Sequence, residues 1–328
     1  MTSSPTIPSP TAATELGQHV AAGLRRTPKA LSSMYFYDDA GSRLFQQIMD
    51  LPEYYPTRAE FAIFREHGAA LAAALRPPAG EAFALVELGA GDGAKTKLLL
   101  RELLRAGTDF AYAPVDISEG AMTGLVNALR HEMPALRVTP VVSDYATALA
   151  QLRTRPGSKA VLFLGSNIGN FGPPERLDFL RKLAAPLGPA DRLLIGFDLQ
   201  KDPRRIRAAY DDAQGVTAAF NLNLLTRLNR ELGADFDLAH WQHYTDYSPL
   251  NGAVRSYLVS TRAQQVRIEA LGETFDFAAW EVIHTENSYK FTLPQIEELA
   301  AAAGLRVVAS FPDAAADFAD VVLAAQAE

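Results

Sequence analysis

Short apolar runs alternate with longer amphipathic segments through the middle of the chain. The runs are rich in Val, Leu and Phe, as expected of strands that are buried on both faces of a sheet. Strands that alternate with helices in this way predict a parallel sheet covered by helices on both sides. The pattern predicts strands over 83–87, 110–115, 136–142, 160–164 and 192–197, and helices over 94–106, 118–133, 145–152 and 173–185.

The chain before this region has a different pattern. Residues 15–25 predict a helix, and residues 58–75 predict a longer one. Between them lie two aromatic stretches, 34–39 and 51–58, and the run Ala40-Gly41-Ser42 predicts a break in regular structure. The Ser-, Thr- and Pro-rich start has no signal-peptide pattern and is predicted to be a disordered lead-in over residues 1–14.

The chain from 199 to 286 interrupts the alternation with Asn-containing helices followed by strands of alternating character, at 255–260 and 265–268. After it, a helix is predicted from Thr292 to Gly304, followed by strands over 305–310 and 320–324. We therefore expect two domains. One combines 15–63 with 201–290, and the other, which contains the sheet, combines 64–200 with 291–328.

Composition narrows the function. The chain of 328 residues carries a net charge of −7, which argues against nucleic acid or an anionic membrane as the main partner. Cysteine is absent, which excludes disulfides, thiolate nucleophiles and cysteine-built zinc sites. No apolar run approaches the roughly 20 residues that span a bilayer. We expect a cytoplasmic protein that acts on a small molecule, and a monomer, as is common for parallel-sheet enzymes of this size.

The strongest chemical signal is the stretch from Glu87 to Gly93, which follows the first predicted strand of the sheet. Its glycines, Gly89 and Gly91 among them, let the backbone approach a ligand closely at the carboxyl end of a strand, where open α/β sheets bind ligands. The carboxylates of Glu87 and Asp92 would repel a pyrophosphate but suit a cationic sulfonium. The glycines alone do not distinguish a ligand-binding loop from a Gly-rich turn.

Acidic residues also follow the next two strands. Asp116 is placed to bind ribose hydroxyls, as in a methyltransferase or a nicotinamide enzyme. Asp144 stands where a methyltransferase reads the adenine amino group, next to Tyr145. A single strand-end Asp is usually a helix N-cap. Three acids after three successive strands favour S-adenosylmethionine as the ligand.

Candidate residues for the second substrate lie elsewhere. Asn170 follows the fourth strand, where its amide can face the reacting groups, whereas Asn167 is left open as a turn residue. Tyrosines in loop-like contexts can hydrogen-bond an amine or carboxylate, although packing is the commoner role of any single tyrosine. Glu286 lies at the return to the sheet, and we assign no role to the nearby His284. The tyrosines are Tyr37, Tyr54, Tyr55 and Tyr210.

Taken together, these segments resemble the histidine Nα-methyltransferases of ergothioneine biosynthesis, which convert L-histidine to its trimethyl betaine, hercynine. The resemblance implies a Rossmann-like class I methyltransferase sheet domain. It also implies a second, α+β, substrate-binding domain built from the N-terminal part and the insertion. The segments occur in family order and are 36–38, 51–58, 87–96, 164–170, 198–202, 209–221 and 285–291.

The resemblance also implies roles for single residues, and it implies no metal. Tyr37 would lie close to the transferring methyl group, and with Asn170 it is the candidate catalytic pair. The amino acid's α-carboxylate and α-amine would be held by Tyr54, Asn170 and Tyr210. Glu286 and Ser288 would bind the imidazole. The predicted S-adenosylmethionine-binding residues are Glu87, Gly89, Gly91, Lys95, Asp116, Asp144 and Tyr145.

One position departs from the family pattern. Where the family has Ile-Glu-Met before a strand, this chain reads Val254-Arg255-Ser256. The methionine lines the side-chain pocket in the family, so Ser256 predicts a roomier and more polar pocket. Methylation of another aromatic amino acid therefore stays an alternative. So do a nicotinamide oxidoreductase, for which no hydride-transfer residues stand out, and a non-catalytic adenosylmethionine-binding protein.

Overall fold

The computed structural model describes residues 10–77 and 81–326, which form two compact units. The sheet unit comprises Tyr55–Lys201 and Tyr289–Glu328, and the insertion unit comprises Met1–Tyr54 and Asp202–Ser288. The first boundary lies earlier than the expected position at residue 64. The reason is that helix α3 (Tyr55–Leu75) packs along its length on elements of the sheet unit.

The sheet unit is built on a mixed sheet of eight strands, in the order β13-β14-β7-β6-β2-β3-β4, with β5 beside β3. The central strands are parallel, and only β14 runs antiparallel to its neighbours β7 and β13. This confirms the predicted α/β class with a largely parallel sheet. The strands are β2 (Phe83–Leu88), β3 (Phe110–Asp116), β4 (Arg137–Val138), β5 (Val141–Val142), β6 (Ser158–Phe163), β7 (Arg192–Asp198), β13 (Leu305–Pro312) and β14 (Phe318–Ala325).

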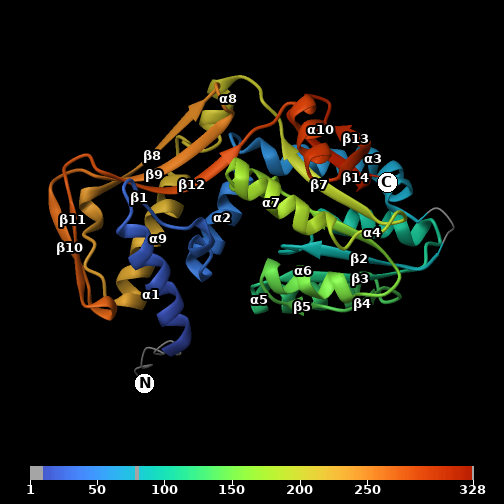
Figure 1. Cartoon of the computed structure of the whole chain (residues 1–328), viewed down its shortest axis with the longest axis horizontal. Coiled ribbons are helices and arrows are strands. Elements are labelled where there is room, and N and C mark those ends of the chain that lie inside the picture. Colours follow the sequence, from blue (N-terminus) through green and yellow to red (C-terminus); the bar gives the residue numbers. More distant parts are fainter. Residues whose placement is uncertain (1–9, 78–80, 327–328) are drawn as a thin grey trace. The chain divides into compact units, whose positions relative to one another are not determined.

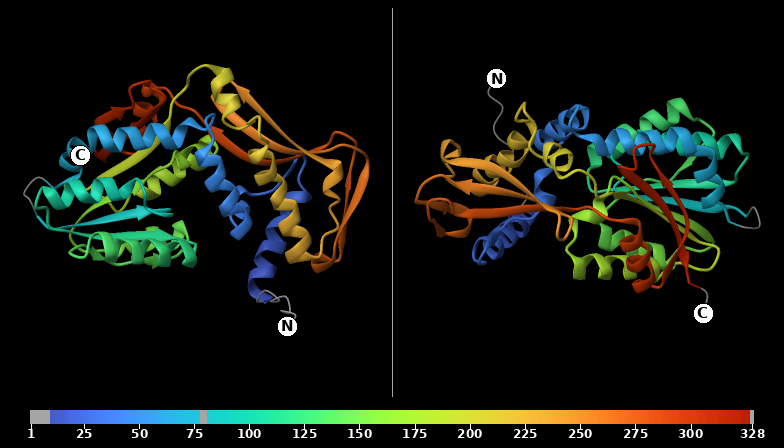
Figure 2. Two further views of the ribbon diagram at one scale, coloured as in Figure 1. Left: turned by 180° about the vertical axis from the view of Figure 1, so that it is seen from behind. Right: turned by 90° about the horizontal axis from the view of Figure 1, so that it is seen from above.

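Helices cover both faces of this sheet, as Figures 1 and 2 show. One apolar core joins the sheet to α3, α4 (Thr96–Arg105) and α5 (Glu119–Glu132). A second core on the other face joins it to α6 (Tyr145–Thr154), α7 (Pro173–Ala184) and α10 (Leu293–Ala302). The chain starts at β2, proceeds outward to β3 and β4, and returns to β6 on the other side of β2. Ligands bind at such a reversal, at the carboxyl ends of the strands.

The expected strand over 136–142 is in fact two short pieces, β4 and β5, which both pair with β3. Pro140 lies between them and has no backbone N–H to donate to the ladder. The backbone N–H of Thr139 still donates to Tyr112 O at 2.8 Å. Both pieces run parallel to β3, so Asp144 still follows the carboxyl end of the strand that lies beside β3.

The insertion unit contains a four-stranded sheet in the order β1-β12-β9-β8 and a separate hairpin of β10 and β11. Residues of α1, α9 and these strands form its apolar core. The strands are β1 (Lys29–Ala30), β8 (Trp241–Ser248), β9 (Ala253–Ser260), β10 (Gln264–Ile268), β11 (Glu273–Phe277) and β12 (Val282–Tyr289, whose last residue belongs to the sheet unit). The helices are α1 (Pro10–Leu24), α2 (Asp39–Asp50), α8 (Pro203–Ala208) and α9 (Val216–Leu232), with 3-10 turns η1 (Ser33–Phe36), η3 (Leu238–His240) and η4 (Glu269–Leu271).

The N-terminal part differs from two of the expectations. Residues 1–9 of the predicted lead-in lie outside the described residues, but α1 begins at Pro10, so the rest of the lead-in is helical. The break predicted at 40–42 is wrong, because these residues form the first turn of α2. Asp38 caps this helix by accepting the Gly41 N–H at 2.7 Å, and a Cβ at Gly41 would lie only 1.7 Å from Phe36 O. The glycine permits a close approach of two backbone segments and does not end a helix.

Candidate active site

The glycine loop after β2 is fixed by a carboxylate from the next strand. Asp116, the last residue of β3, accepts the Gly91 N–H with Oδ2 and the Ser118 N–H with Oδ1, both at 2.9 Å. The N–H of Gly89 donates to Val115 O at 2.8 Å. These bonds hold the loop at the carboxyl end of β2. Asp116 therefore shapes the predicted ligand loop as well as being a candidate ligand-binding residue.

Tyr145 lies against the same loop. Gly89 has a φ of +76°, and a Cβ there would lie 2.8 Å from Tyr145 Oη. Glycine meets both demands, the left-handed backbone and the close approach of the tyrosine. Burial, with a smaller contribution from the charge of Asp116, raises the pKa of Tyr145 to about 12. Tyr145 is therefore a neutral phenol at physiological pH, with its ring edge-on to Phe163 at 5.5 Å between centroids.

Glu87 is buried in the strand rather than presented at the surface of the loop. Its side chain is 3% exposed, and its oxygens accept hydrogen bonds from Thr96 Oγ1 at 2.6 Å and from the Tyr112 hydroxyl. Burial raises the pKa of Glu87 to about 7, against the opposing effect of these hydrogen bonds. The structure thus places Glu87 beneath the loop, where it joins the start of α4 to strand β3.

Lys95 forms an ion pair with Glu60 of α3, whose other oxygen accepts the Gly165 N–H at 2.9 Å. Burial is the largest single influence and lowers the pKa of Lys95, but the charge and hydrogen bond of Glu60, together with the charges of Asp320 and Glu87, outweigh it and raise the pKa of the ammonium group. Asp320 is buried nearby, and neither of its carboxylate oxygens has a hydrogen-bond partner among the described residues. Burial and the charge of Glu60 raise the pKa of Asp320, which favours its neutral form.

Asp144 is exposed and serves as the N-cap of α6, because its Oδ1 accepts the Thr147 N–H at 2.7 Å. This hydrogen bond lowers the pKa of the carboxyl group. The capping role that a strand-end Asp usually plays is therefore present here. Contact of Asp144 with adenine stays a prediction.

The loop after β6 carries the two asparagines. Ser166 adopts a left-handed conformation, with φ of +60°, and starts the 3-10 turn η2 (Asn167–Asn170). Asn167 donates from Nδ2 to Leu164 O at 3.0 Å, so this side chain stabilises the turn. Asn170 ends the turn and is exposed. Contact of Asn170 with a ligand stays a prediction.

In the insertion unit, three of the predicted tyrosines are joined through aromatic contacts. Tyr54 meets Tyr210 edge-on, with 6.2 Å between ring centroids, and meets Phe45 in the same manner. Tyr37 packs edge-on against Phe45 at 5.5 Å and against Phe220 at 5.7 Å. Segments far apart in the sequence thus supply one aromatic cluster, the tyrosine cluster, made of Tyr37, Phe45, Tyr54, Tyr210 and Phe220. Tyr37 is 46% exposed, so part of this cluster faces solvent.

Ser288 lies beside the tyrosine cluster, with its hydroxyl 2.8 Å from that of Tyr210. The position of Ser288 depends on a change of phase in β12, where the alternation of buried and less buried side chains shifts by one residue. The buried residues of this strand are Ile283, Thr285 and then Ser288, an interval of three where regular alternation would give two. On the other side of the strand, His284 Nε2 lies 3.1 Å from Asn287 Oδ1, which fits the same shift. Thr285 and Ser288 are therefore both turned inward.

Ser256 is buried within a polar network of the insertion unit. Its hydroxyl lies 3.3 Å from that of Thr245, and its backbone oxygen accepts the Thr285 hydroxyl at 3.0 Å. Thr285 lies within 3.1 Å of Asn221 Oδ1. His243 lies 3.2 Å from the Thr245 hydroxyl, and burial lowers its pKa to about 4, which makes it neutral at pH 7. Ser256 is thus part of a buried network of polar side chains.

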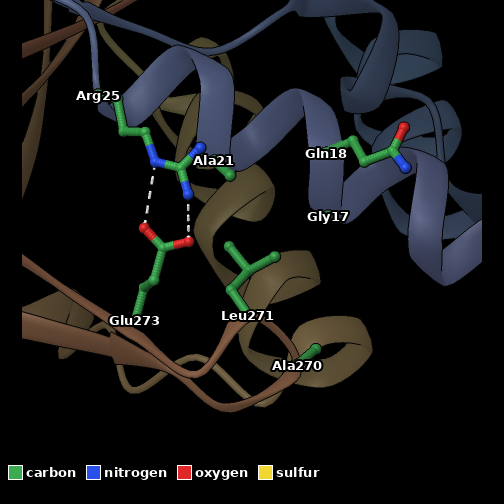
Figure 3. A pocket seen from close by; sticks show the side chains of 7 residues that line it. All are labelled: Gly17, Gln18, Ala21, Arg25, Ala270, Leu271 and Glu273. Atoms are coloured by element: carbon green, nitrogen blue, oxygen red, sulfur yellow. Dashed lines mark hydrogen bonds and ion pairs between the residues drawn. The ribbon is translucent and has the colours of Figure 1, made fainter.

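A separate hollow of about 400 Å³ lies between α1 and the turn before β11 (Figure 3). It is flanked by an exposed ion pair, in which Arg25 Nε donates to Glu273 Oε2 at 3.2 Å. None of the predicted site residues lines it, and its walls offer little apart from this pair. Its lining residues are Gly17, Gln18, Ala21, Arg25, Ala270, Leu271 and Glu273.

The described ranges, 10–77 and 81–326, contain neither a helix that could cross a bilayer nor a cluster of side chains that could hold a metal ion. No helix there combines the length and apolar character that crossing a bilayer requires. In the same ranges, no group of three or more His, Cys, Asp or Glu side chains is arranged to hold a metal ion.

No local pattern in the sequence marks several of the residues around the proposed site. Glu60 lies near the start of helix α3, and no local pattern marks it as the partner of Lys95. Asn221, Thr245 and Thr285 come from a helix and two strands and meet only in the fold. The alternation of β9 and β10 is visible in the sequence, whereas strand β8 and the phase change in β12 are not predicted from it.

The chain is similar to known proteins over most of its length. From residue 16 to residue 325 it matches the family described as "Histidine-specific methyltransferase, SAM-dependent". It is 43% identical over 307 residues to the histidine N-alpha-methyltransferase of Mycolicibacterium smegmatis, covering 94% of each chain. It is 41% identical over 303 residues to the protein of the same name from Mycobacterium tuberculosis, covering 92% of each. Among solved structures, the CcbJ methyltransferase from Streptomyces caelestis matches with a TM-score of 0.44 and 16% identity, over 80% of this chain and 96% of that one.

Proposed function

The chain belongs to the family of histidine-specific, S-adenosylmethionine-dependent methyltransferases, and we propose that its sheet unit binds the methyl donor and its insertion unit binds the amino acid. The activity is Nα-methylation of histidine, a reaction of ergothioneine biosynthesis. We further infer that methylation proceeds to the trimethyl product, hercynine. The enzyme acts on small molecules, and we expect it to work as a monomer without a metal.

The glycine loop supports the proposed place of S-adenosylmethionine. The chain reverses direction across the sheet at β2 and β6, and the loop after β2 is tied to Asp116. This is the arrangement of a class I methyltransferase domain, to which we assign the sheet unit. We propose that Asp116 binds the ribose and that Gly89, Gly91 and Lys95 line the donor site. Asp144 and Tyr145 would contact the adenine, and Glu87 would act from beneath the loop.

The tyrosine cluster is the observation that carries the proposed acceptor site. It brings Tyr37, Tyr54 and Tyr210 together and places Ser288 beside the Tyr210 hydroxyl. Phenols and a serine hydroxyl offer neutral hydrogen bonds to an α-carboxylate, an α-amine and an imidazole. We propose that Tyr54 and Tyr210, with Asn170 of the sheet unit, hold the amino-acid head, and that Glu286 and Ser288 bind the ring.

The chemistry is an in-line displacement in which S-adenosylmethionine supplies an already activated methyl group. The nitrogen lone pair forms the new bond to carbon, and the electrons of the broken bond stay on sulfur. Three transfers therefore consume three donors and release three protons per histidine. The protein's main task is to align the nitrogen with the methyl group, and such positioning can contribute up to roughly 7–11 kcal/mol.

The α-amine must lose a proton before each attack. A neutral phenol can both donate and accept a hydrogen bond, so we assign Tyr37 and Tyr54 to orienting the amine. His243 is neutral at pH 7, but its pKa of about 4 makes it a weak base. We propose that the tyrosines and Asn170 select the unprotonated amine by hydrogen bonding, and that the proton leaves to water.

Glu286→Ala is expected to raise the KM for histidine about tenfold to a hundredfold, with a smaller effect on kcat. The proposed bond between this carboxylate and an imidazole N–H is charge-assisted, and such bonds contribute about 1.5–3 kcal/mol. Steady-state kinetics at saturating S-adenosylmethionine measures both constants. Glu281→Ala, a change at the residue that directly precedes the same strand, serves as the control. An unchanged KM in Glu286→Ala would remove this residue from the histidine site.

Ser256→Met is expected to shift selectivity toward histidine and away from larger aromatic amino acids such as tryptophan. Ser256 is 2% exposed beside Thr245, so a longer side chain must project into neighbouring space. Differences of a methylene or two in a pocket typically change discrimination by about tenfold to two-hundredfold. The ratio of kcat/KM for the two amino acids gives the answer. If the ratio stays within a factor of two of wild type, Ser256 does not line the side-chain pocket.

A further inference from the structure

The chain passes between its two units three times, and the sheet-unit residues at these crossings share one partner. The crossings follow Tyr54, Lys201 and Ser288. Tyr55 is the first residue of the sheet unit after one crossing, Lys201 is the last before the second, and Lys290 is the second residue after the third. All three contact the carboxylate of Asp198, which also belongs to the sheet unit.

The contacts around Asp198 use both of its oxygens. The Tyr55 hydroxyl lies 2.9 Å from Oδ1 and 3.0 Å from Oδ2. Lys201 Nζ donates to Oδ1 at 2.5 Å and also to the Tyr55 hydroxyl at 2.8 Å. Lys290 Nζ lies 2.8 Å from Oδ2. We call these four residues, Tyr55, Asp198, Lys201 and Lys290, the crossing cluster.

The crossing cluster is buried, which makes its partners interdependent. Asp198 is 0% exposed, and the side chains of Lys201 and Lys290 are 8% and 0% exposed. A buried charge is tolerated only when it is paired and hydrogen-bonded. Two ammonium groups face this one carboxylate, and Asp317 adds negative charge near Lys201. Removing the charge of Asp198 therefore weakens its bonds to Tyr55, Lys201 and Lys290 at the same time.

Asp198 also holds the turn that carries Asn170. Its backbone N–H donates to Ser166 Oγ at 2.9 Å, and Ser166 starts η2 in a left-handed conformation. A hydrogen bond of this kind restrains a backbone that an L-residue seldom adopts. One residue at the carboxyl end of β7 thus anchors the start of α3, the end of β12 and the turn after β6.

We propose that Asp198 is a positioning residue for the methyl acceptor. Tyr54 directly precedes Tyr55, Ser288 lies two residues before Lys290, and Asn170 ends the turn that begins at Ser166. Tyr54, Ser288 and Asn170 are the residues of these segments that are proposed to hold the amino acid. Each therefore lies close in sequence to a residue that is hydrogen-bonded or paired to Asp198. This inference rests on the proposed acceptor residues. In this proposal the buried crossing cluster keeps the amino acid aligned for methyl transfer, although the cluster does not itself contact the substrate.

Asp198→Asn tests the inference, because it keeps the shape of the side chain and removes its charge. Asp191→Asn is the matched control. Asp191 directly precedes the same strand β7 at its opposite end, is buried, and pairs with Lys159 at 2.8 Å. Asp198→Asn loses two buried ion pairs and Asp191→Asn loses one, so both variants should unfold at lower temperature. Each is assayed for the KM and kcat with histidine and for the Kd of S-adenosylmethionine by calorimetry, at a temperature where both remain folded.

For Asp198→Asn we expect a histidine KM raised about tenfold or more and a lower kcat, since small misplacements of reacting groups are costly. The Kd for S-adenosylmethionine should stay within about threefold of wild type. Asp191→Asn should leave all three constants within about twofold. Equal changes of KM in the two variants would overturn the inference. If Asp198→Asn does not fold, Tyr55→Phe, which removes one neutral donor, should still raise the histidine KM, and an unchanged KM there would also overturn it.

The outcome is separable from that of the proposed function. Wild-type enzyme that methylates histidine, and a Tyr54→Phe variant with a raised histidine KM, would support the acceptor site on their own. If those results hold while Asp198→Asn behaves like Asp191→Asn, only the positioning role of Asp198 fails. If Tyr54→Phe leaves the histidine KM unchanged, the acceptor site itself is misassigned, and the positioning inference is overturned with it.

Discussion

Replacing Asp116 with alanine is expected to weaken binding of S-adenosylmethionine by about a hundredfold or more. The carboxylate accepts two backbone N–H groups, from Gly91 and Ser118, and so fixes the glycine loop. It is also the proposed partner of the ribose hydroxyls. Hydrogen bonds to a charged group contribute about 1.5–3 kcal/mol each, so losing the proposed ribose contacts, together with the order of the loop, accounts for an effect of this size.

Calorimetric titration with S-adenosylmethionine measures this effect, and Asp109→Ala provides the control. Asp109 directly precedes the same strand β3 at its other end, and it pairs on the surface with Arg137. That variant should bind the donor as wild type does. If Asp116→Ala kept its Kd within about threefold of wild type, the glycine loop would not be the donor site.

Glu87→Gln is expected to stabilise the enzyme at pH 8 by up to about 3 kcal/mol, while leaving its stability near pH 4 little changed. Burial raises the pKa of Glu87 to about 7 from its ordinary value of 4.5. Between these values the folded protein keeps a proton that the unfolded chain releases, so stability falls as pH rises through this window. Glutamine is neutral throughout and can still bond to the hydroxyls of Thr96 and Tyr112.

Urea denaturation at several pH values between 4 and 8, without S-adenosylmethionine, measures this prediction. The gain of Glu87→Gln over wild type should grow with pH and level off above about 7, where the folded carboxyl has ionised. Other groups titrate equally in both proteins and cancel in the difference. A gain that is independent of pH, or a loss that grows with pH, would show that Glu87 is ionised in the folded protein.

The sheet and the glycine loop after β2 could be predicted from the sequence because both depend on local patterns. The runs at 83–87 and 110–115 fall within β2 and β3, and the residues that follow them, Gly89 and Asp116, meet at the loop. A parallel sheet places successive strand ends at one edge, so the order of motifs along the chain is also an order in space. The family resemblance supplied the histidine acceptor, which these local patterns do not specify.

What could not be predicted depends on long-range contacts. Tyr55, Asp198 and Lys290 are separated by long stretches of chain and meet only in the folded sheet unit. Gly41 looks like a helix breaker, yet the approach of Phe36 O makes glycine necessary inside the first turn of a helix. The phase change in β12 leaves no local signature. In each case the deciding partner lies on another element or across a turn of the backbone.

The most direct test of the account is to identify the product. Wild-type enzyme is incubated with S-adenosylmethionine and L-histidine, and the masses and fragmentation of the products are followed over time. We predict successive addition of three methyl groups, all on the α-nitrogen, ending in hercynine, with slower or no reaction of tryptophan. Methylation of the imidazole ring, or no methylated histidine while another amino acid reacts, would contradict the assignment.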